Sequence, residues 1–166
     1  MADYKRLAAL KTLCRLIEQE VGIKAYRGRQ VVGTDIPLPF VVINEAIRAG
    51  DSRTVEEEAR NNRFDRVDFL LSGYAKPNSV ENPMDTAYEW IAKIEQAFAK
   101  IHEINPTNGT EKYPEWYNLG NLVTKFVYNA PVAHNPPNEV QSNSYFYIYF
   151  SFHVGYDARN PYQSDN

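Results

Sequence analysis

The sequence predicts an α+β fold: a mainly antiparallel sheet of four to five strands, two helices packed on one face, and a long charged hairpin loop. Three stretches indicate this architecture. Residues 144–156 alternate with the two-residue period of a β-strand, whereas 3–20 and 82–104 repeat apolar residues at helical spacing. A chain of 166 residues suits one domain, which we place at 1–159, with a polar tail at 160–166 that we expect to fray.

The stretch 144–156 is the strand that organises the rest of the predicted sheet. One face is apolar and carries Phe146, Ile148, Phe150, Phe152 and Val154. The other face is wetter and carries Tyr145, Tyr147, Tyr149, Ser151 and His153. An antiparallel sheet can bury one face and leave the other partly in water. We therefore expect a central strand whose Phe face forms the core.

The N-terminal segment 3–20 reads as an amphipathic helix, with apolar residues on one stripe and charged residues elsewhere. Asp3 is the expected N-cap, and Gly22 stands where a helix commonly ends. Cys14 lies on the apolar stripe, so we expect it in the core. It is the single cysteine of the chain and can form no internal disulfide.

Three strands are predicted before the second helix. Residues 23–27 form a short candidate, 40–44 are a continuous apolar run, and 64–74 alternate and should pair with the strand before them. The charged residues 45–62 lie between the last two. The pattern leaves two possibilities for them, a long hairpin loop or a short solvated helix that starts at Ser52.

The second helix has the clearest start signal in the chain. Asn82 is the expected cap, Pro83 the first helical residue, and Asp85 adds negative charge to the first turn. We expect the helix to continue to about Ile104. Its apolar stripe consists of Ala87, Ile91, Ile94, Phe98 and Ile101, and it should cover the Phe face of the C-terminal strand. After it come loops at 105–121 and 131–144, separated by a strand at 122–128.

The residues give no sign of catalysis, of a metal or of a cofactor. His102, His134 and His153 lack partners at metal-ligand spacing, and the run Glu56–Glu58 is typical of a solvated face. The net charge of −3 provides no general attraction to nucleic acid or to an anionic membrane. No apolar run is long enough for a transmembrane helix. We expect a protein that is not an enzyme.

The order of the predicted elements resembles a known family. The first helix is followed by Gly-Ile-Lys-Ala-Tyr at 22–26, the second strand opens within Ile-Pro-Leu-Pro-Phe-Val-Val-Ile at 36–43, and the long alternating strand closes the fold at 146–156. This arrangement is similar to the tail terminator (tail completion) proteins of tailed bacteriophages and to the related minor tail proteins. The resemblance covers nearly the whole chain as a pattern of elements.

The resemblance implies a structural virion protein. Such proteins form a ring, usually a hexamer, at the head-proximal end of the tail tube, where they end tube growth and provide the surface for head–tail joining. The implied partners are further copies of the chain, the tail tube protein and a head connector or neck protein. Genomic DNA would pass through the lumen without specific binding, and no membrane is involved. The implied location is the neck region of the virion tail, after assembly in the host cytoplasm.

Within this hypothesis, two groups of residues are candidates for the interface with another subunit or with the tube. The charged segment contributes Arg53, Glu56, Glu57, Glu58, Arg60 and Arg63, and the wetter strand face contributes Tyr145, Tyr147 and Tyr149. Three competing hypotheses stay open: another phage neck or head-completion protein, a small soluble enzyme whose site is assembled from scattered residues, and a monomeric binding module.

Overall fold

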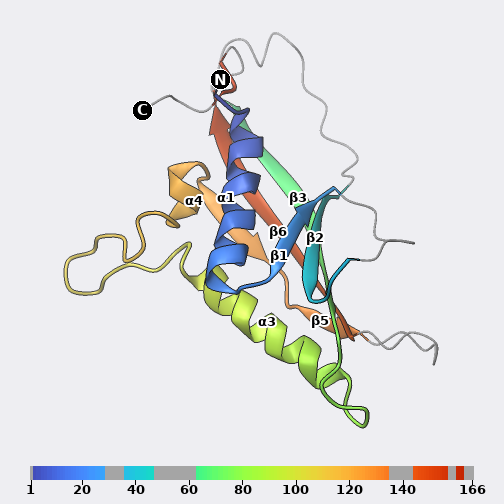
Figure 1. Ribbon diagram of the computed structural model, residues 1–166. Helices are drawn as coiled ribbons and strands as arrows, with labels where there is room; N and C mark the ends of the chain where they lie inside the picture. The colour runs from blue at the N-terminus through green and yellow to red at the C-terminus, as the bar shows by residue number, and fades with distance from the viewer. Residues whose placement is uncertain (1, 29–35, 47–62, 135–143, 157–159, 163–166) are drawn as a thin grey trace.

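The protein has the predicted mixed α+β fold, with a mostly antiparallel sheet and helices packed against it (Figure 1). The computed structural model describes residues 2–28, 36–46, 63–134, 144–156 and 160–162. The elements are α1 (Lys5–Glu20), β1 (Lys24–Arg27), β2 (Phe40–Glu45), β3 (Arg63–Ala75), α3 (Met84–Ala99), α4 (Asn118–Asn121), β4 (Lys125–Tyr128), β5 (Val132–His134) and β6 (Ser144–Tyr156). Residues 47–62, for which we expect a hairpin loop or a helix, lie outside the described residues.

The strand β6 is central, as predicted from its alternation. It pairs antiparallel with β3 from Arg63–Tyr156 to Ala75–Ser144, and its other edge pairs with β4 and then with β5. The complete order is β1-β2-β3-β6-β4, with β5 beside β6. One pair departs from the antiparallel pattern, because β1 and β2 run parallel. The described part of the chain thus forms one strand more than the upper end of our prediction.

Both long helices lie on the same face of the sheet (Figure 1). The Phe face of β6 points toward them, and none of its five apolar side chains is more than 2% exposed. The ring of Phe150 stacks on Phe69 of β3 at 5.1 Å and on Phe126 of β4 at 5.5 Å. Phe98 of α3 completes this cluster in an edge-to-face contact with Phe126, with the ring centres 5.1 Å apart. The predicted packing of the helical stripe on the Phe face is therefore confirmed.

Neither predicted N-cap is used. No side-chain hydrogen bond caps α1, and the Asp3 carboxylate instead pairs with Lys11 at 2.8 Å. At α3, Asn82 offers its backbone carbonyl to the Asp85 amide, and Pro83 precedes the helix. The end of α1 is as expected, since Gly22 adopts φ +78°, a conformation that glycine takes without steric cost.

The helix α3 ends at Ala99, five residues before its predicted end. The backbone tightens there, because the amides of Lys100, Ile101 and His102 each bond to the carbonyl three residues earlier. Ile101 nevertheless stays fully buried, so the apolar stripe continues past the helix. The periodic apolar stripe predicted which side chains are buried. It did not predict where the α-helical hydrogen bonds of the backbone end.

Two short elements lie where only loops were predicted. The three-residue strand β5 falls within 131–144, and the four-residue α4 falls within 105–121. Leu119 of α4 and the nearby Trp116 are buried against α1 and the core. The C-terminal segment also contacts the body, since Pro161 accepts a hydrogen bond from the Lys5 amide and Tyr162 bridges to Tyr4. The rest of the predicted tail, residues 163–166, lies outside the described residues.

Candidate interaction surface

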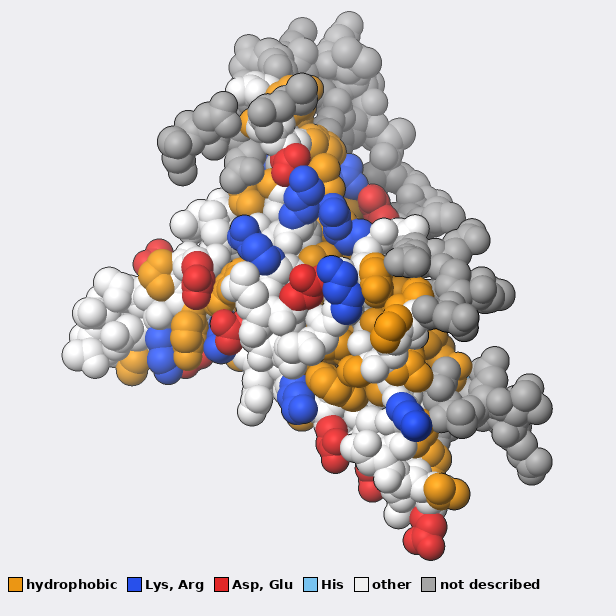
Figure 2. All heavy atoms as spheres, in the orientation of Figure 1, with side chains coloured by type: hydrophobic (Ala, Val, Ile, Leu, Met, Phe, Trp, Pro, Cys, Tyr) orange, Lys and Arg blue, Asp and Glu red, His pale blue; other side chains and the backbone are white. Residues whose placement is uncertain are grey.

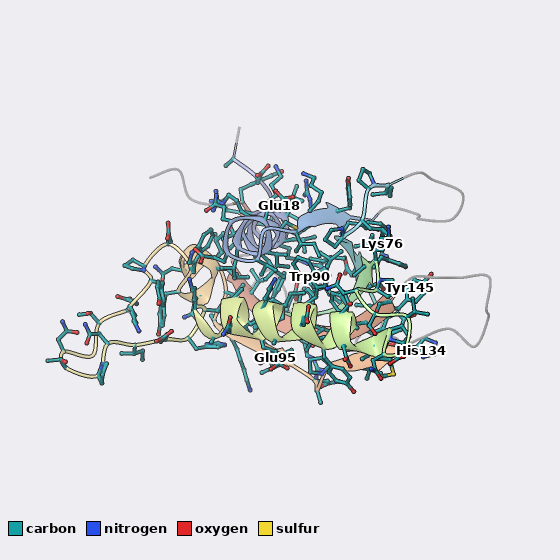
Figure 3. All side chains as sticks on the ribbon, turned by 60° about the horizontal axis from the view of Figure 1, so that its bottom comes forward. Glu18, Lys76, Trp90, Glu95, His134 and Tyr145 are labelled. Carbon is teal, nitrogen blue, oxygen red and sulfur yellow. The ribbon has the colours of Figure 1, made fainter. Side chains whose placement is uncertain are left out.

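The outer face of the sheet, which points away from α1 and α3, carries the aromatic residues that the alternation predicted to be wet. The strand register arranges them in rows that cross the sheet. One row contains Phe40, Tyr74, Tyr145 and His134, from four different strands. Figure 3 shows Tyr145 and His134 at the same end of the sheet. Within the described residues, no helix covers this face.

Aromatic rings contact one another along this side of the outer face. Measured between ring centres, Tyr26 lies edge-on to Phe40 at 6.0 Å and Phe40 stacks on Tyr74 at 4.9 Å. Tyr74 in turn lies edge-on to Tyr145 at 5.1 Å. Phe40 is only 2% exposed although it lies outside the main core. Burial raises the pKa of the Tyr74 hydroxyl, and the neighbouring Tyr147 and Tyr145 raise it further. These ring contacts join β1, β2, β3 and β6 across the outer face and stabilise the pairing of the strands.

A more exposed apolar patch lies beside the row, where β4 and β5 meet β6. We define the outer patch as Val127, Val132, Tyr147 and Tyr149. Val132 lies opposite Tyr147, and Val127 lies opposite Ser151, the next outward position after Tyr149. Val132 is 54% exposed, Tyr149 53% and Val127 39%. Such a group of exposed apolar side chains on one sheet face is typical of a protein–protein contact.

A polar group bounds the outer patch along β6. The Ser151 hydroxyl donates to the Asp68 carboxylate, which also accepts a hydrogen bond from Arg66 at 2.9 Å. Ser151 is buried, and Asp68 is half-buried. On β3 and β6 this polar pair borders the outer patch, whereas on β4 the same row contributes Val127 to the patch.

The predicted interface residues fall into two groups. Tyr145, Tyr147 and Tyr149 lie on the outer face, with Tyr149 the most exposed. Arg63 begins β3, and its side chain is not described. The remaining candidates, Arg53, Glu56, Glu57, Glu58 and Arg60, lie outside the described residues.

Sequence reasoning missed the patch residues that do not come from β6. Val127 and Val132 join the outer patch only because β4 and β5 pair with β6 in particular registers. Val127 lies within the strand predicted at 122–128, whereas Val132 lies in a segment predicted as a loop. The register that brings them beside Tyr147 and Tyr149 depends on tertiary pairing and could not be read from the chain.

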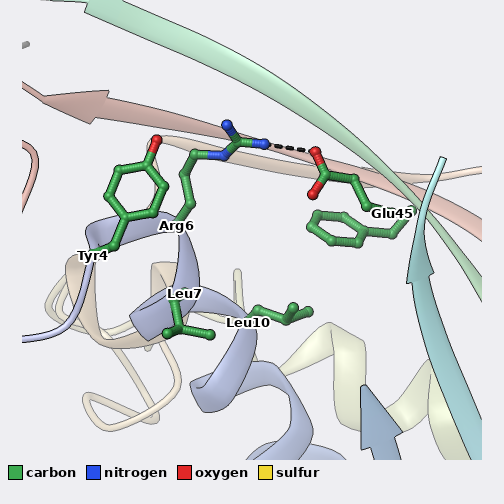
Figure 4. A pocket seen from close by; sticks show the side chains of 6 residues that line it. Tyr4, Arg6, Leu7, Leu10 and Glu45 are labelled. Carbon is green, nitrogen blue, oxygen red and sulfur yellow. Dashed lines mark hydrogen bonds and ion pairs between the residues drawn. The ribbon is translucent and has the colours of Figure 1, made fainter. Parts of the chain in front are cut away.

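Two of the shallow hollows formed by the described residues lie elsewhere on the surface. The first has a volume of about 340 Å³ and lies between α1 and the sheet (Figure 4). It is lined by Tyr4, Arg6, Leu7, Leu10, Glu45 and Phe69. The Arg6 guanidinium bonds to the Glu45 carboxylate at 2.7 Å across its rim. We call it the α1 hollow.

The second hollow, of about 260 Å³, lies beside α3 near Trp90. The Lys93 ammonium stands over the Trp90 ring, 4.4 Å from its centre, and Lys76 also contributes to the lining. This is an exposed cation–π contact, which stabilises the side chains by roughly 0.5–1 kcal/mol. Neither hollow brings together a nucleophile and a base.

The side chains of Cys14 and His102 could in principle react, but their contacts are those of structural residues. Burial raises the pKa of the Cys14 thiol to about 11, so the thiol stays protonated and is a poor nucleophile at neutral pH. A ring nitrogen of His102 is 3.0 Å from the Phe126 carbonyl oxygen. Among the described residues, no three His, Cys, Asp or Glu side chains are placed to hold a metal ion. No helix in the described part of the chain is long and apolar enough to cross a membrane.

Comparison with known proteins gives no family for this chain. No protein-family model matches it, and no curated protein matches its sequence.

Proposed function

We propose that the protein is a structural subunit of the tail terminator type, which assembles as a ring, with a hexamer as the expected form, at the head-proximal end of a bacteriophage tail tube. In this role it ends tube growth and provides the surface for head–tail joining, within the neck of the virion. The observation that carries the proposal is the outer patch, in which Val127, Val132 and Tyr149 are exposed and Tyr147 is half-buried on one face of the sheet.

The composition of the outer patch favours a protein partner. Tyrosine is enriched at protein interfaces, where its large ring is ordered at little entropic cost. The strand pairing already fixes the backbone beneath Tyr147 and Tyr149, so a partner need not order a loop in order to bind them. The half-buried Tyr74 and Tyr145 extend the surface on one side. We infer that another subunit of the assembly covers this face.

An enzymatic function has less support. An active site commonly combines an enclosed pocket with a titratable group whose pKa is strongly shifted. The large shift in the described residues belongs to Cys14, and burial within the core accounts for it. A monomeric binding module, or a different neck or head-completion protein, would use the same outer patch and would differ in the partner that it binds.

The nucleic-acid partner in this proposal is DNA that moves through the lumen. Tight binding of DNA requires that basic side chains neutralise several phosphates and release their counterions. The chain has 18 basic and 21 acidic residues, which makes strong attraction to DNA unfavourable overall. Passage of DNA without retention is consistent with this balance.

The test combines the mass in solution with binding to purified tail tubes. A double variant, Val132→Ser with Tyr149→Ser, should keep its free energy of unfolding within about 1 kcal/mol, because both side chains are half exposed. Its affinity for tubes or for other copies should fall by about 30-fold or more, as expected for the loss of about 2 kcal/mol at an interface. A matched control is Tyr88→Ser on α3, which is 57% exposed and lies away from the outer face. A wild-type protein that stays monomeric and also fails to bind tubes would refute the proposal.

A further inference from the structure

A short hairpin projects from the body after α3 (Figure 1). We call residues 103–112 the arm. Its two sides are joined by backbone hydrogen bonds from the Lys112 amide to the Glu103 carbonyl at 3.0 Å and from the Asn105 amide to the Thr110 carbonyl at 2.7 Å. The Glu103 and Lys112 side chains also form an ion pair at 2.8 Å. The arm thus has its own local structure, which holds the tip in a defined turn.

The tip of the arm carries the one Asn-Gly pair of the sequence, Asn108–Gly109. Residues 106–112 are all exposed, and Figure 2 shows the end of the arm standing clear of the body as backbone and uncharged polar atoms. In an Asn-Gly pair the backbone nitrogen after the asparagine can approach the side-chain amide with little hindrance, because glycine has no Cβ. The tip is therefore open to water and also open to an attack from within the chain.

Two hydrogen bonds converge on the side-chain oxygen of Asn108. The Thr110 amide donates to this oxygen at 3.0 Å, and the Thr110 hydroxyl donates to it at 2.7 Å. The first bond closes a turn in which the asparagine side chain takes the place of a backbone peptide, and such a turn holds the Asn108 Cγ close to the Gly109 nitrogen. Negative charge develops on the side-chain oxygen when that nitrogen attacks Cγ. Both Thr110 donors already point at this oxygen, so they are placed to stabilise the charge.

One contact opposes the attack. The Gly109 amide donates to the Asn105 carbonyl at 2.9 Å, so this hydrogen bond must open before the nitrogen can lose its proton. The bond lies at an exposed tip that buries little surface, and local openings of this kind cost little free energy. We therefore expect the bond to slow the reaction and not to prevent it.

We propose that Asn108 is a site of self-modification, at which the Gly109 nitrogen displaces the side-chain amide as ammonia. Hydroxide removes the Gly109 amide proton, and the nitrogen lone pair forms a bond to the Asn108 Cγ. The bond from Cγ to the side-chain nitrogen then breaks, and that nitrogen leaves as ammonia after it takes a proton from water. Water adds to one carbonyl of the cyclic imide and opens the ring. Opening at Cγ gives aspartate and opening at the backbone carbonyl gives isoaspartate, and either route consumes one water and releases one ammonia.

The modification changes both the charge and the backbone of the arm. A carboxylate replaces a neutral amide, so the tip gains a negative charge. In isoaspartate the chain continues through the side-chain carbon, which adds one atom to the backbone between Asn108 and Gly109. The hydrogen bonds that the tip makes to the backbone of Asn105 then no longer match the length of the turn. This chemistry is independent of the proposed assembly role, and its failure would leave that role standing.

The test is incubation of the full chain at neutral and alkaline pH, followed by peptide mapping with mass spectrometry. Conversion of Asn108 to aspartate and isoaspartate should increase with pH, because hydroxide removes the amide proton. Asn105 on the same arm is an internal control. Its side-chain oxygen also accepts a hydrogen bond from the amide two residues later, at Thr107, but the next residue is Pro106, which has no N–H to lose. An Asn108 that stays intact, or that is converted no faster than Asn105, overturns the inference.

Two variants of Thr110 test the part played by the hydrogen bonds at the tip. Thr110→Val keeps the shape of the side chain and the amide donor but lacks the hydroxyl. Conversion of Asn108 should slow by about fivefold in this variant, because one of the two donors to the developing negative charge is lost. Thr110→Ser restores the hydroxyl and should restore the rate. Equal or faster conversion in Thr110→Val would overturn the inference that this turn promotes the reaction.

Discussion

Phe150 and Tyr149 are neighbours on β6 with opposite surroundings, and they test the assignment of faces. Phe150 is 2% exposed and stacks on Phe69 and Phe126, so Phe150→Ala should cost roughly 3–5 kcal/mol of unfolding free energy. Tyr149 is 53% exposed, and Tyr149→Ala should cost much less. Urea denaturation of both variants measures the difference. A larger loss for Tyr149→Ala would mean that the faces are assigned the wrong way round.

Cys14 provides a prediction about pH. Its thiol pKa is raised from 9.0 to about 11 because burial disfavours the thiolate, so the folded protein should react slowly with iodoacetamide at pH 8. The unfolded chain loses this proton at lower pH than the folded protein does. The contribution of Cys14 to stability is therefore complete below about pH 9 and is lost as the pH rises toward 11.

The measurement is the rate of alkylation against pH, with and without denaturant. Unfolded protein should react rapidly near pH 9, and folded protein only near pH 11. Equal rates in the two states at pH 8 would contradict the buried position of the thiol.

At the scale of single elements, the sequence predicted best where many residues repeat one pattern. The alternation along β6 and the stripe of α3 both involve five or more side chains, and both buried faces were identified correctly. The predicted caps each depend on one side chain that has several possible partners. Asp3 bonds to Lys11 and not to the start of α1, which depends on how the chain folds around that end.

The sequence did not predict the short elements β5 and α4, for a related physical reason. β5 has three residues, and its backbone is ordered by hydrogen bonds to β6 and not by its own propensity. In α4, Leu119 and the adjacent Gly120 both have positive φ, which no helical pattern would predict. Burial of Leu119 and Trp116 holds this segment against α1. Elements that depend on tertiary contacts in this way leave little trace in the sequence.

For the candidate surface, the sequence predicted which side chains of β6 point outward. It did not predict which residues of the other strands lie beside them. The period of β6 placed Tyr145, Tyr147 and Tyr149 on the wet face, because alternation alone determines which face a side chain takes. The aromatic row also requires Phe40 and Tyr74, whose positions follow from the register of β2 against β3. Register depends on the pairing of whole strands, so the extent of the surface could be known only from the fold.

At the scale of the whole molecule, basic and acidic residues are unevenly distributed along the chain, and ion pairs within the fold join them. Residues 5–28 have a net charge of +4 and residues 81–115 have a net charge of −4, so the total of −3 conceals a basic region and an acidic region. Within one subunit the two regions meet where Lys100 of the acidic region pairs with Glu20 of the basic region at 2.5 Å. Acidic side chains outside residues 5–28 offset part of the basic charge of α1, since Asp3 pairs with Lys11 and Glu45 pairs with Arg6. Contacts of this kind should weaken as the salt concentration rises, because ions screen exposed charges.

The charged segment between β2 and β3 gives the last prediction. Residues 51–62 contain one apolar residue larger than alanine, Val55, so the segment can bury little surface. Its charges alternate in sign, with Arg53 and Arg60 on either side of the run Glu56–Glu58, a pattern that suits pairing with a neighbouring subunit. Replacement of residues 52–61 by a short Gly-Ser linker should leave the thermal midpoint almost unchanged.

Assembly should respond to this replacement even though folding does not. In electron micrographs, particles made with the linker variant should have overlong tubes or tubes that lack heads. A variant with Glu56, Glu57 and Glu58 each changed to Lys should behave in the same way, because it keeps the length of the segment and reverses its charge. A change of Tyr88 to Ser on α3 serves as the surface control and should give normal particles. Tubes of normal length joined to heads in both segment variants would show that residues 51–62 are solvated surface with no part in assembly.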